Sequence, residues 1–85
     1  MDNSEIAHPA LFARLRSWRM AKAVEMNVPA FGIFTQKTLY ELINYLPADE
    51  KSLRKINGIG AKKFLQFGTE IMEIIREYCE EKDIH

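Results

Sequence analysis

Residues 53–63 read LRKINGIGAKK, and this stretch decides how the chain folds. Leu53 and Ile56 are three residues apart, which places both on one face of a helix. Asn57 and Gly58 are residue types that accept positive φ, and such residues commonly end a helix. The stretch therefore predicts the end of a short helix, a glycine hairpin and the start of a longer helix.

The two glycines also make this hairpin a candidate holder of nucleic-acid backbone. Gly60 lets the backbone turn tightly while Ile59 points back into the core, and the first turn of the next helix keeps unpaired N–H groups. Those groups and the helix dipole favour an anion. The local pattern resembles a helix-hairpin-helix element, and its basic neighbours are Arg54, Lys55, Lys62 and Lys63. A tight joint between two helices with solvated lysines fits the same residues, so the stretch alone leaves both interpretations open.

Length and composition place the chain among small folded proteins. Its 85 residues make one domain, and 47% hydrophobic and 28% charged residues are ordinary for a soluble fold. No apolar run approaches the ~18 residues that span a bilayer, and the acidic N-terminus has no signal-peptide pattern. A lone Cys79 excludes an internal disulfide, which is compatible with a reducing cytoplasm.

The net charge of zero hides a segregation along the chain. Residues 1–68 hold ten basic and six acidic side chains (+4), whereas residues 69–85 hold two basic and six acidic ones (−4). A basic body can offer a positive face to a polyanion even when an acidic last helix cancels its charge. Binding through such a face is expected to be weak and sensitive to salt.

The rest of the chain predicts helices joined by short connections. Proline suits the first helical position, so a first helix is expected from Pro9 to about residue 26, before the stop at residues 27–29. Further helices are predicted from a Thr35 cap to Pro47, from an Asp49 cap to about Ile56, and from Ala61 to about Lys82. The fold class is thus all-α: a compact bundle of four to five helices with a helix-hairpin-helix-like joint. We expect one domain over residues 8–82, with a leader or linker end over 1–7 and a tail over 83–85.

Apolar residues at spacings of three and four predict the buried face of each helix. The first stripe comprises Leu11, Phe12, Leu15, Trp18 and Ala23, and the clearest one comprises Leu39, Leu42, Ile43 and Leu46. The last comprises Phe64, Phe67, Ile71, Ile74, Ile75 and Tyr78, widened by Leu65, Met72 and Cys79. Gly68 lies inside this last stripe and indicates either a close helix crossing or a bend.

The apolar stripes do not decide whether three further side chains are buried. Arg19 falls inside the first stripe, so we expect a partly buried guanidinium held by carboxylates or carbonyls. Lys22 falls there too and is expected at the edge. Phe31, in the connection that also supplies Ile33 and Phe34 to the core, can be a core residue or a surface platform for stacking a base; we favour the core.

Catalysis finds little support in the sequence. His8 and His85 lie near the chain ends, without cysteines or carboxylates at metal-ligand spacing. No serine nucleophile motif occurs, and the Gly58-Ile59-Gly60 run is neither a dinucleotide fingerprint nor a Walker loop. We expect no catalytic residue, no metal and no cofactor.

A wider set of residues resembles the HRDC domain, named for helicase and RNase D C-terminal regions, and most of all the HRDC domains of RecQ-type DNA helicases. The set comprises LFARLR (11–16), Arg19, Ala23, NVPAF (27–31), Ile33, Phe34, Thr38, Leu39, Pro47, Leu53, INGIG (56–60), Lys63, Phe67, Gly68 and Ile75. The resemblance implies a non-catalytic accessory module of a larger ATP-dependent DNA helicase or RNase D-like nuclease. In that family the module binds single-stranded or structured DNA weakly, or mediates protein contacts. Phe31 stands where the family often has tyrosine, and Lys22 where it often has an apolar residue.

Two basic patches are therefore candidates for DNA contact. The first comprises Lys51, Arg54, Lys55, Lys62 and Lys63 around Gly58 and Gly60, and the second comprises Lys22, Phe31 and Lys37. Contacts of this kind position a strand without reading its bases. The alternative is a protein–protein module that docks on the parent enzyme or a partner through Glu73, Glu77 and Glu80 of the acidic last helix. We expect a monomer without membrane contact, located in the cytoplasm and associated with the nucleoid if the source is bacterial.

Overall fold

The computed structural model describes residues 7–83. Its elements are α1 (Pro9–Met26), the 3₁₀ turn η2 (Ala30–Gly32), α2 (Gln36–Tyr45), α3 (Glu50–Arg54), α4 (Ala61–Lys63), the π-helical turn η3 (Phe64–Gly68) and α5 (Thr69–Glu81). No strand occurs in this described part, and the all-α class is confirmed. Most of the leader expected over 1–7 and of the tail expected over 83–85 lies outside the described residues, as does His85.

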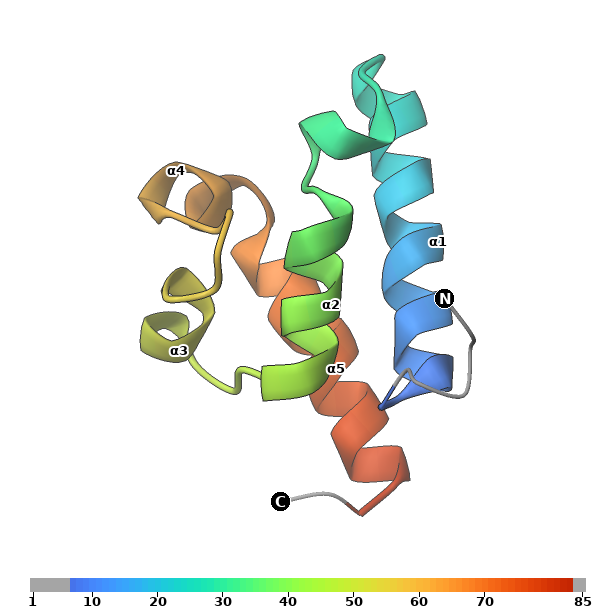
Figure 1. Cartoon of the computed structure of the whole chain (residues 1–85), viewed down its shortest axis with the longest axis vertical. Coiled ribbons are helices and arrows are strands. Elements are labelled where there is room, and N and C mark those ends of the chain that lie inside the picture. Colours follow the sequence, from blue (N-terminus) through green and yellow to red (C-terminus); the bar gives the residue numbers. More distant parts are fainter. Residues whose placement is uncertain (1–6, 84–85) are drawn as a thin grey trace.

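The helices pack around α2 (Figure 1). On one side α1 runs alongside α2 in the opposite direction, and α5 passes behind and also packs against α1. The short helices α3 and α4 lie on the other side of α2, where α3 packs against η3. The hairpin between α3 and α4 is therefore separated from α1 by α2.

The two longer N-terminal helices end at left-handed residues. Asn27 (φ 57°) follows α1, and Leu46 (φ 46°) follows α2 directly before Pro47. Thr35 caps α2, as predicted, because its Oγ1 accepts the N–H of Thr38 at 3.3 Å. These ends confirm the predicted bounds of both helices to within about two residues.

The third helix is shorter than predicted. Asp49 caps it as expected, since its Oδ1 accepts the N–H of Ser52 at 2.8 Å, and this hydrogen bond lowers the pKa of Asp49. The helix ends at Arg54 instead of Ile56. The reason lies in the backbone: the N–H groups of Lys55 and Ile56 bond to carbonyls three residues back, so the chain tightens before the hairpin.

The core holds most of the residues that helical spacing predicts. Its buried members are Leu11, Leu15, Ala23, Ile33, Phe34, Leu39, Leu42, Ile43, Leu53, Ile56, Ile59, Phe67, Ile71, Ile75 and Tyr78. Leu65 is the exception: it was expected to widen the last stripe, but it is 84% exposed. It lies in the π-helical turn η3, whose wider turn shifts the 3.6-residue spacing on which the expectation rests.

Gly68 lies in the same turn. A Cβ atom at this position would overlap the ring of Phe64, one turn earlier in the same helical segment. The small residue here is thus explained by the close contact with Phe64 of the same helical segment.

Arg19 joins α1 to the start of α2. Its side chain is buried, with Nη1 donating to the carbonyl of Phe34 at 3.2 Å and Nη2 donating to Oε1 of Gln36 at 3.3 Å. Burial lowers the pKa of Arg19, and repulsion from Arg16 adds to the effect. Among the described residues its Nε has no hydrogen-bond partner. A partly buried guanidinium held by carbonyl groups is thus confirmed.

Polar contacts between α1 and α5 close the other side of the bundle. Both guanidinium nitrogens of Arg14 donate to the carboxylate of Glu81, at 2.6 and 3.0 Å. His8 Nδ1 and the hydroxyl of Tyr78 are 2.9 Å apart, so this histidine is held against α5. Within residues 7–83 no group of His, Cys, Asp or Glu could hold a metal ion, and no helix is long and apolar enough to cross a membrane.

Candidate nucleic-acid interface

Two side chains of α2 hold the hairpin over residues 55–60 by bonding to the backbone of Asn57. The hydroxyl of Thr38 donates to the carbonyl of Asn57 at 2.6 Å. The N–H of Asn57 donates to Oε1 of Glu41 at 3.0 Å. Thr38 and Glu41 are three residues apart and therefore lie on one face of α2. The hairpin is thus fixed to α2 through both backbone polar groups of Asn57.

The two glycines of the hairpin have different roles. Gly58 has φ +93°, and a Cβ atom there would overlap the Thr38 hydroxyl. Only glycine fits this position, as predicted. Gly60 has φ −97° and ψ −167°, ordinary extended backbone, and a Cβ atom there would meet nothing within 4 Å. The expectation that Gly60 is needed for a tight turn is wrong, because the turn is made at Gly58.

Three of the predicted basic residues surround one hollow beside the hairpin. This hollow, of about 530 Å³, is lined by Glu50, Lys51, Arg54, Lys55, Gly60 and Ala61. Lys51 and Lys55 are exposed side chains on α3 and at its end. We call this surface, Lys51, Arg54 and Lys55 together with Lys62 on α4, the hairpin face.

Carboxylates neutralise little of the hairpin face. Arg54 pairs with Glu50 one turn away, at 3.4 Å, and both side chains are about half-exposed. Lys51, Lys55 and Lys62 form no ion pair with any residue in 7–83. An exposed ion pair between residues four apart contributes little energy and is easily exchanged. Asp49 lies near two of these lysines without pairing with them: its pKa is lowered first by the hydrogen bonds to Ser52 and then by the charges of Lys51 and Lys55. The three lysines are therefore free of ion pairs, with Asp49 and Glu50 beside them.

The helix that follows the hairpin is continuous. α4 is three residues long, but the backbone keeps right-handed helical angles through η3 into α5, so its first N–H groups begin a helical run that ends at Glu81. Gly60 provides no side-chain cap for these groups. The electrostatic case for the hairpin therefore combines this helix end with the basic side chains around it.

Lys63 points away from the hairpin face and joins the two predicted patches. Its Nζ donates to the carbonyl of Gly32 in η2 at 2.6 Å and lies 5.6 Å from the ring centre of Phe67. Phe31, next to Gly32, is 72% exposed, so the expectation that it is a core residue is wrong. Ile33 and Phe34 fill the core at this connection, and the turn η2 leaves Phe31 outside.

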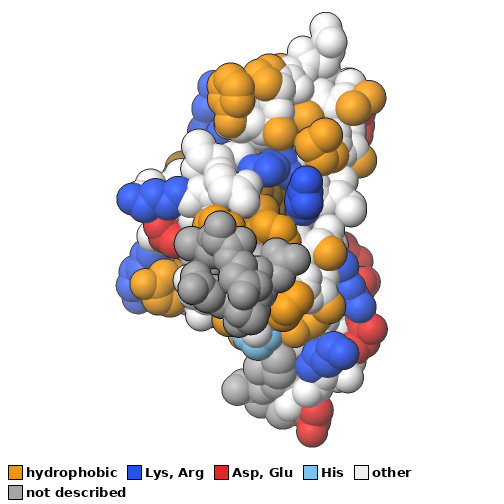
Figure 2. Space-filling model, turned by 45° about the vertical axis from the view of Figure 1, so that its right-hand side comes forward, with side chains coloured by type: hydrophobic (Ala, Val, Ile, Leu, Met, Phe, Trp, Pro, Cys, Tyr) orange, Lys and Arg blue, Asp and Glu red, His pale blue; other side chains and the backbone are white. Residues whose placement is uncertain are grey.

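Exposed apolar side chains line a hollow next to this connection, at the end of α1. They include Met20, Val24 and Val28, with Pro29 and Ala30 directly before Phe31. Figure 2 shows hydrophobic side chains gathered at this upper end, where Figure 1 places the end of α1 and η2.

The other two residues of the second patch differ from each other. Lys22 is paired with Glu25 at 3.4 Å and Glu70 at 3.2 Å, and its side chain is only 17% exposed. The hydrogen bond to Glu70 raises the pKa of Lys22. Lys22 lies at the edge of the core as expected, but it is already neutralised, whereas Lys37 is exposed and unpaired within the described residues.

Comparison with known proteins decides the family. The HRDC domain family matches residues 8–75, which is most of the chain. The chain belongs to the HRDC family. The resemblance that residues 11–75 carry is thereby confirmed.

Relatives of this HRDC domain are parts of bacterial helicases. The chain is 42% identical over 66 residues to the ATP-dependent DNA helicase UvrD2 of Mycobacterium tuberculosis (strain ATCC 25618 / H37Rv), a stretch that covers 78% of the chain and 9% of the helicase. It is 41% identical over 68 residues to the ATP-dependent DNA helicase RecQ of Pasteurella multocida (strain Pm70), covering 80% and 11%. For RecQ of Bacillus subtilis (strain 168) the identity is 34% over 73 residues, covering 86% and 12%. These relatives support a helicase as the parent and give no support to an RNase D-like nuclease.

Two residues that build the hairpin of this HRDC domain escaped the sequence analysis as functional positions. Thr38 is 1% exposed beside Leu39 and bonds the hairpin carbonyl, and Glu41 binds the hairpin N–H. A threonine inside an apolar stripe, followed three residues later by a glutamate, was the available signal. It could not identify the partner, because Asn57 is 16 or more residues away in sequence.

Proposed function

We propose that this HRDC domain is a non-catalytic accessory domain of a larger DNA helicase that binds single-stranded or structured DNA weakly. The observation that carries the proposal is the hairpin face, where Lys51, Arg54 and Lys55 surround one hollow and the lysines form no ion pair with residues 7–83. Phosphates attract such a surface whatever the base sequence. In a bacterial source, this role places the chain in the cytoplasm, at the nucleoid.

A second set of contacts extends the proposed surface. Lys63 lies against the η2 connection, so a strand that leaves the hairpin face meets Phe31 next. An exposed aromatic ring can stack on an unpaired base. Lys37, exposed at the first turn of α2, is a further cation for the same strand. Lys22 has no part in this surface, since Glu25 and Glu70 already hold its ammonium group.

The proposed binding is weak because few phosphates are neutralised. Each contact to single-stranded DNA contributes about −0.7 to the slope of log affinity against log salt. A handful of contacts gives micromolar or weaker binding for the isolated domain. Tethering to a helicase that already holds DNA raises the effective concentration, which makes weak contacts useful.

The test is fluorescence anisotropy of labelled single-stranded and forked DNA with the 85-residue chain at about 50 mM and 200 mM salt. Lys55→Glu and Lys62→Glu should each weaken binding and lower the salt slope. Arg76→Glu is the matched control: it makes the same change in charge on α5, where Arg76 pairs with Glu80 at 3.6 Å. Absence of binding by the wild-type chain at about 50 mM salt, or equal losses in all three variants, would overturn the proposal.

A second candidate function is docking of a basic protein surface on α5. A small hollow of about 200 Å³ is lined by Trp18, Glu70, Glu73, Ile74 and Glu77. An apolar floor rimmed by carboxylates suits a lysine- or arginine-rich partner such as another part of the helicase. Glu80, the third glutamate expected there, is engaged with Arg76.

Chemical-shift mapping separates the two functions. DNA should perturb the amide signals of residues 51–63, whereas a docking partner should perturb those of residues 70–82. Perturbation by DNA confined to residues 70–82 would contradict the DNA proposal, because that helix carries the acidic face.

A further inference from the structure

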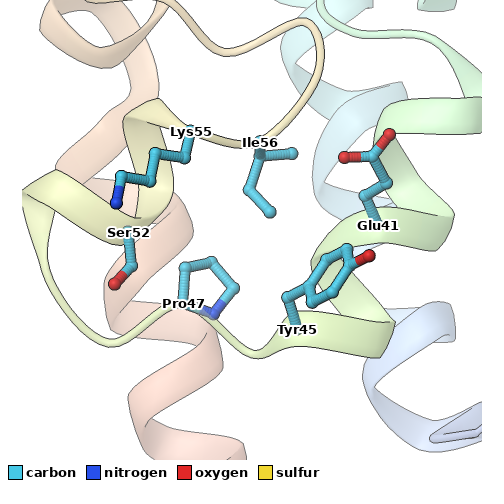
Figure 3. A pocket seen from close by; sticks show the side chains of 6 residues that line it. All are labelled: Glu41, Tyr45, Pro47, Ser52, Lys55 and Ile56. Atoms are coloured by element: carbon cyan, nitrogen blue, oxygen red, sulfur yellow. The ribbon is translucent and has the colours of Figure 1, made fainter.

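A second hollow lies next to the hairpin face, between α2 and α3. It measures about 430 Å³ and is lined by Glu41, Tyr45, Pro47, Ser52, Lys55 and Ile56. Figure 3 shows Glu41 and Tyr45 on the α2 side, Lys55 and Ser52 on the α3 side, and Pro47 and Ile56 between them. Neither the family resemblance nor the proposed phosphate contacts assign a ligand to this hollow.

Packing within the fold does not explain why a tyrosine stands at position 45. Its side chain is 71% exposed, and its ring makes no aromatic contact within residues 7–83. The ring therefore adds little to the core, although Pro47 and Ile56 beside it are buried. An aromatic face next to a rigid apolar floor is the kind of surface on which a planar ligand stacks.

The polar groups of the hollow stand at opposite walls. The carboxylate of Glu41 is held in place because its Oε1 accepts the N–H of Asn57 at 3.0 Å, and its Oε2 has no partner among the described residues. The ammonium group of Lys55 forms no ion pair within residues 7–83, and it points away from Glu41 and Tyr45 (Figure 3). The hollow thus offers a fixed acceptor and an aromatic face, with a cation at its outer edge.

Lys55 connects this hollow to the hairpin face, because it lines both. A strand whose phosphates lie along Lys51, Arg54 and Lys55 therefore passes the rim of the second hollow. A base of that strand, if unpaired, is within reach of Tyr45.

We propose that the hollow between α2 and α3 is a pocket for one unpaired nucleobase, which stacks on Tyr45 while Lys55 contacts the adjacent phosphate. The free oxygen of Glu41 accepts a hydrogen bond from an exocyclic amino group, as carboxylates do with cytosine N4. Thymine presents a carbonyl oxygen at that position, which the carboxylate repels. The pocket therefore prefers cytosine to thymine. This inference rests on the proposed DNA binding and adds a base contact to it.

The test compares labelled oligo(dC), oligo(dT) and duplex DNA by anisotropy at one low salt concentration. Tyr45→Ala should weaken binding of single strands about tenfold and leave duplex binding unchanged, and Tyr45→Phe, which keeps the ring, should bind like the wild type. Glu41→Gln keeps an oxygen for the Asn57 N–H but adds a donor for thymine O4, so it should reduce the preference for oligo(dC). Circular dichroism checks that each variant is folded.

The outcomes distinguish this inference from the proposed function. If Lys51→Glu loses binding while Tyr45→Ala binds single strands like the wild type, the phosphate surface stands and the base pocket is overturned. Equal losses for single strands and duplex in Tyr45→Ala also overturn the pocket. If the wild type binds no oligonucleotide, both proposals fail. Amide shifts around Tyr45 on addition of a proline-rich peptide, with none on addition of oligo(dC), would assign the hollow to a protein ligand and overturn the inference.

Discussion

The two sides of α2 treat their cations differently. On the α1–α5 side, Arg14 is bound to Glu81, and Lys22 is bound to Glu25 and Glu70. On the hairpin face, Lys51, Lys55 and Lys62 form no ion pair within residues 7–83, although Asp49 lies near Lys51 and Lys55. Two cations depart from this contrast: Arg16 on α1 forms no ion pair within the described residues, and Arg54 on the hairpin face pairs with Glu50. The contrast therefore lies between Arg14 and Lys22, which join α1 to α5, and the hairpin lysines.

The position of α5 explains this difference. It packs against α1, so Glu81 reaches Arg14 and Glu70 reaches Lys22, while α3 and α4 lie on the other side of α2 (Figure 1). The net charge of zero therefore does not predict the charge of each surface. The acidic α5 lowers the total charge of the chain, but it does not lie beside the basic residues of the hairpin face.

The largest expected effect is on the fold of the hairpin. Gly58→Ala should destabilise the protein by about 2–3 kcal/mol, because it forces a side chain into positive φ and against the Thr38 hydroxyl. Gly60→Ala is the matched control and should change the free energy of unfolding by less than about 0.5 kcal/mol, since its backbone is extended and its surroundings are open. Urea unfolding measures both. Similar losses at the two glycines would show that the turn is not made at Gly58.

Sequence reasoning found the elements of this molecule more completely than its contacts. Helix bounds, caps and core stripes follow from residues close in the chain, and the Thr35 and Asp49 caps were predicted correctly. Leu65 was misplaced because a π-helical turn breaks the assumed spacing. Phe31 was misplaced because η2 itself holds no buried residue, and the two residues that follow it, Ile33 and Phe34, enter the core instead.

The sequence identified the basic residues of the candidate site, but it did not predict how they are arranged or which of them form ion pairs. Spacing on a short helix gave Lys51, Arg54 and Lys55, and the structure brings these three around one hollow. Their freedom from carboxylates depends on where α5 packs, and the neutralisation of Lys22 depends on Glu70, 48 residues away. Such long-range contacts are not visible in a single sequence.

We expect an effect of intermediate size when one lysine on each side of α2 is replaced by alanine. Lys22→Ala should lower the midpoint of thermal unfolding by a few degrees, because it removes the contacts to Glu25 and Glu70 and uncovers Trp18, whose ring centre lies 5.8 Å from the ammonium group. Lys62→Ala should leave the midpoint unchanged and weaken DNA binding. The opposite pattern, with Lys62 stabilising the fold and Lys22 binding DNA, would reverse the roles assigned to the two sides.

The smallest expected effect is the dependence of stability on pH. One carboxylate on each side of α2 contributes to it. The hydrogen bond from Arg14 lowers the pKa of Glu81, and the hydrogen bond from the Ser52 N–H lowers the pKa of Asp49. A carboxylate whose pKa is lower in the folded state adds stability above its unfolded pKa, about 3.9 for Asp and 4.3 for Glu. That stability is lost as the pH falls below those values through the folded pKa. Both groups are exposed, so solvent screening keeps the effect small.

Two isosteric variants assign this pH dependence to its side of the molecule. Glu81→Gln should flatten the fall in urea midpoint between about pH 6 and pH 3, a window that brackets the pKa values of the unfolded chain. Added salt should also flatten this fall in the wild type, because the ion pair between Arg14 and Glu81 is exposed. Asp49→Asn keeps a good helix cap without a titrating group, so it should flatten the same window while leaving stability at neutral pH nearly unchanged. A fall in midpoint that neither variant alters would mean that other carboxylates govern acid unfolding, and that the α1–α5 ion pair orients the helices without contributing to stability.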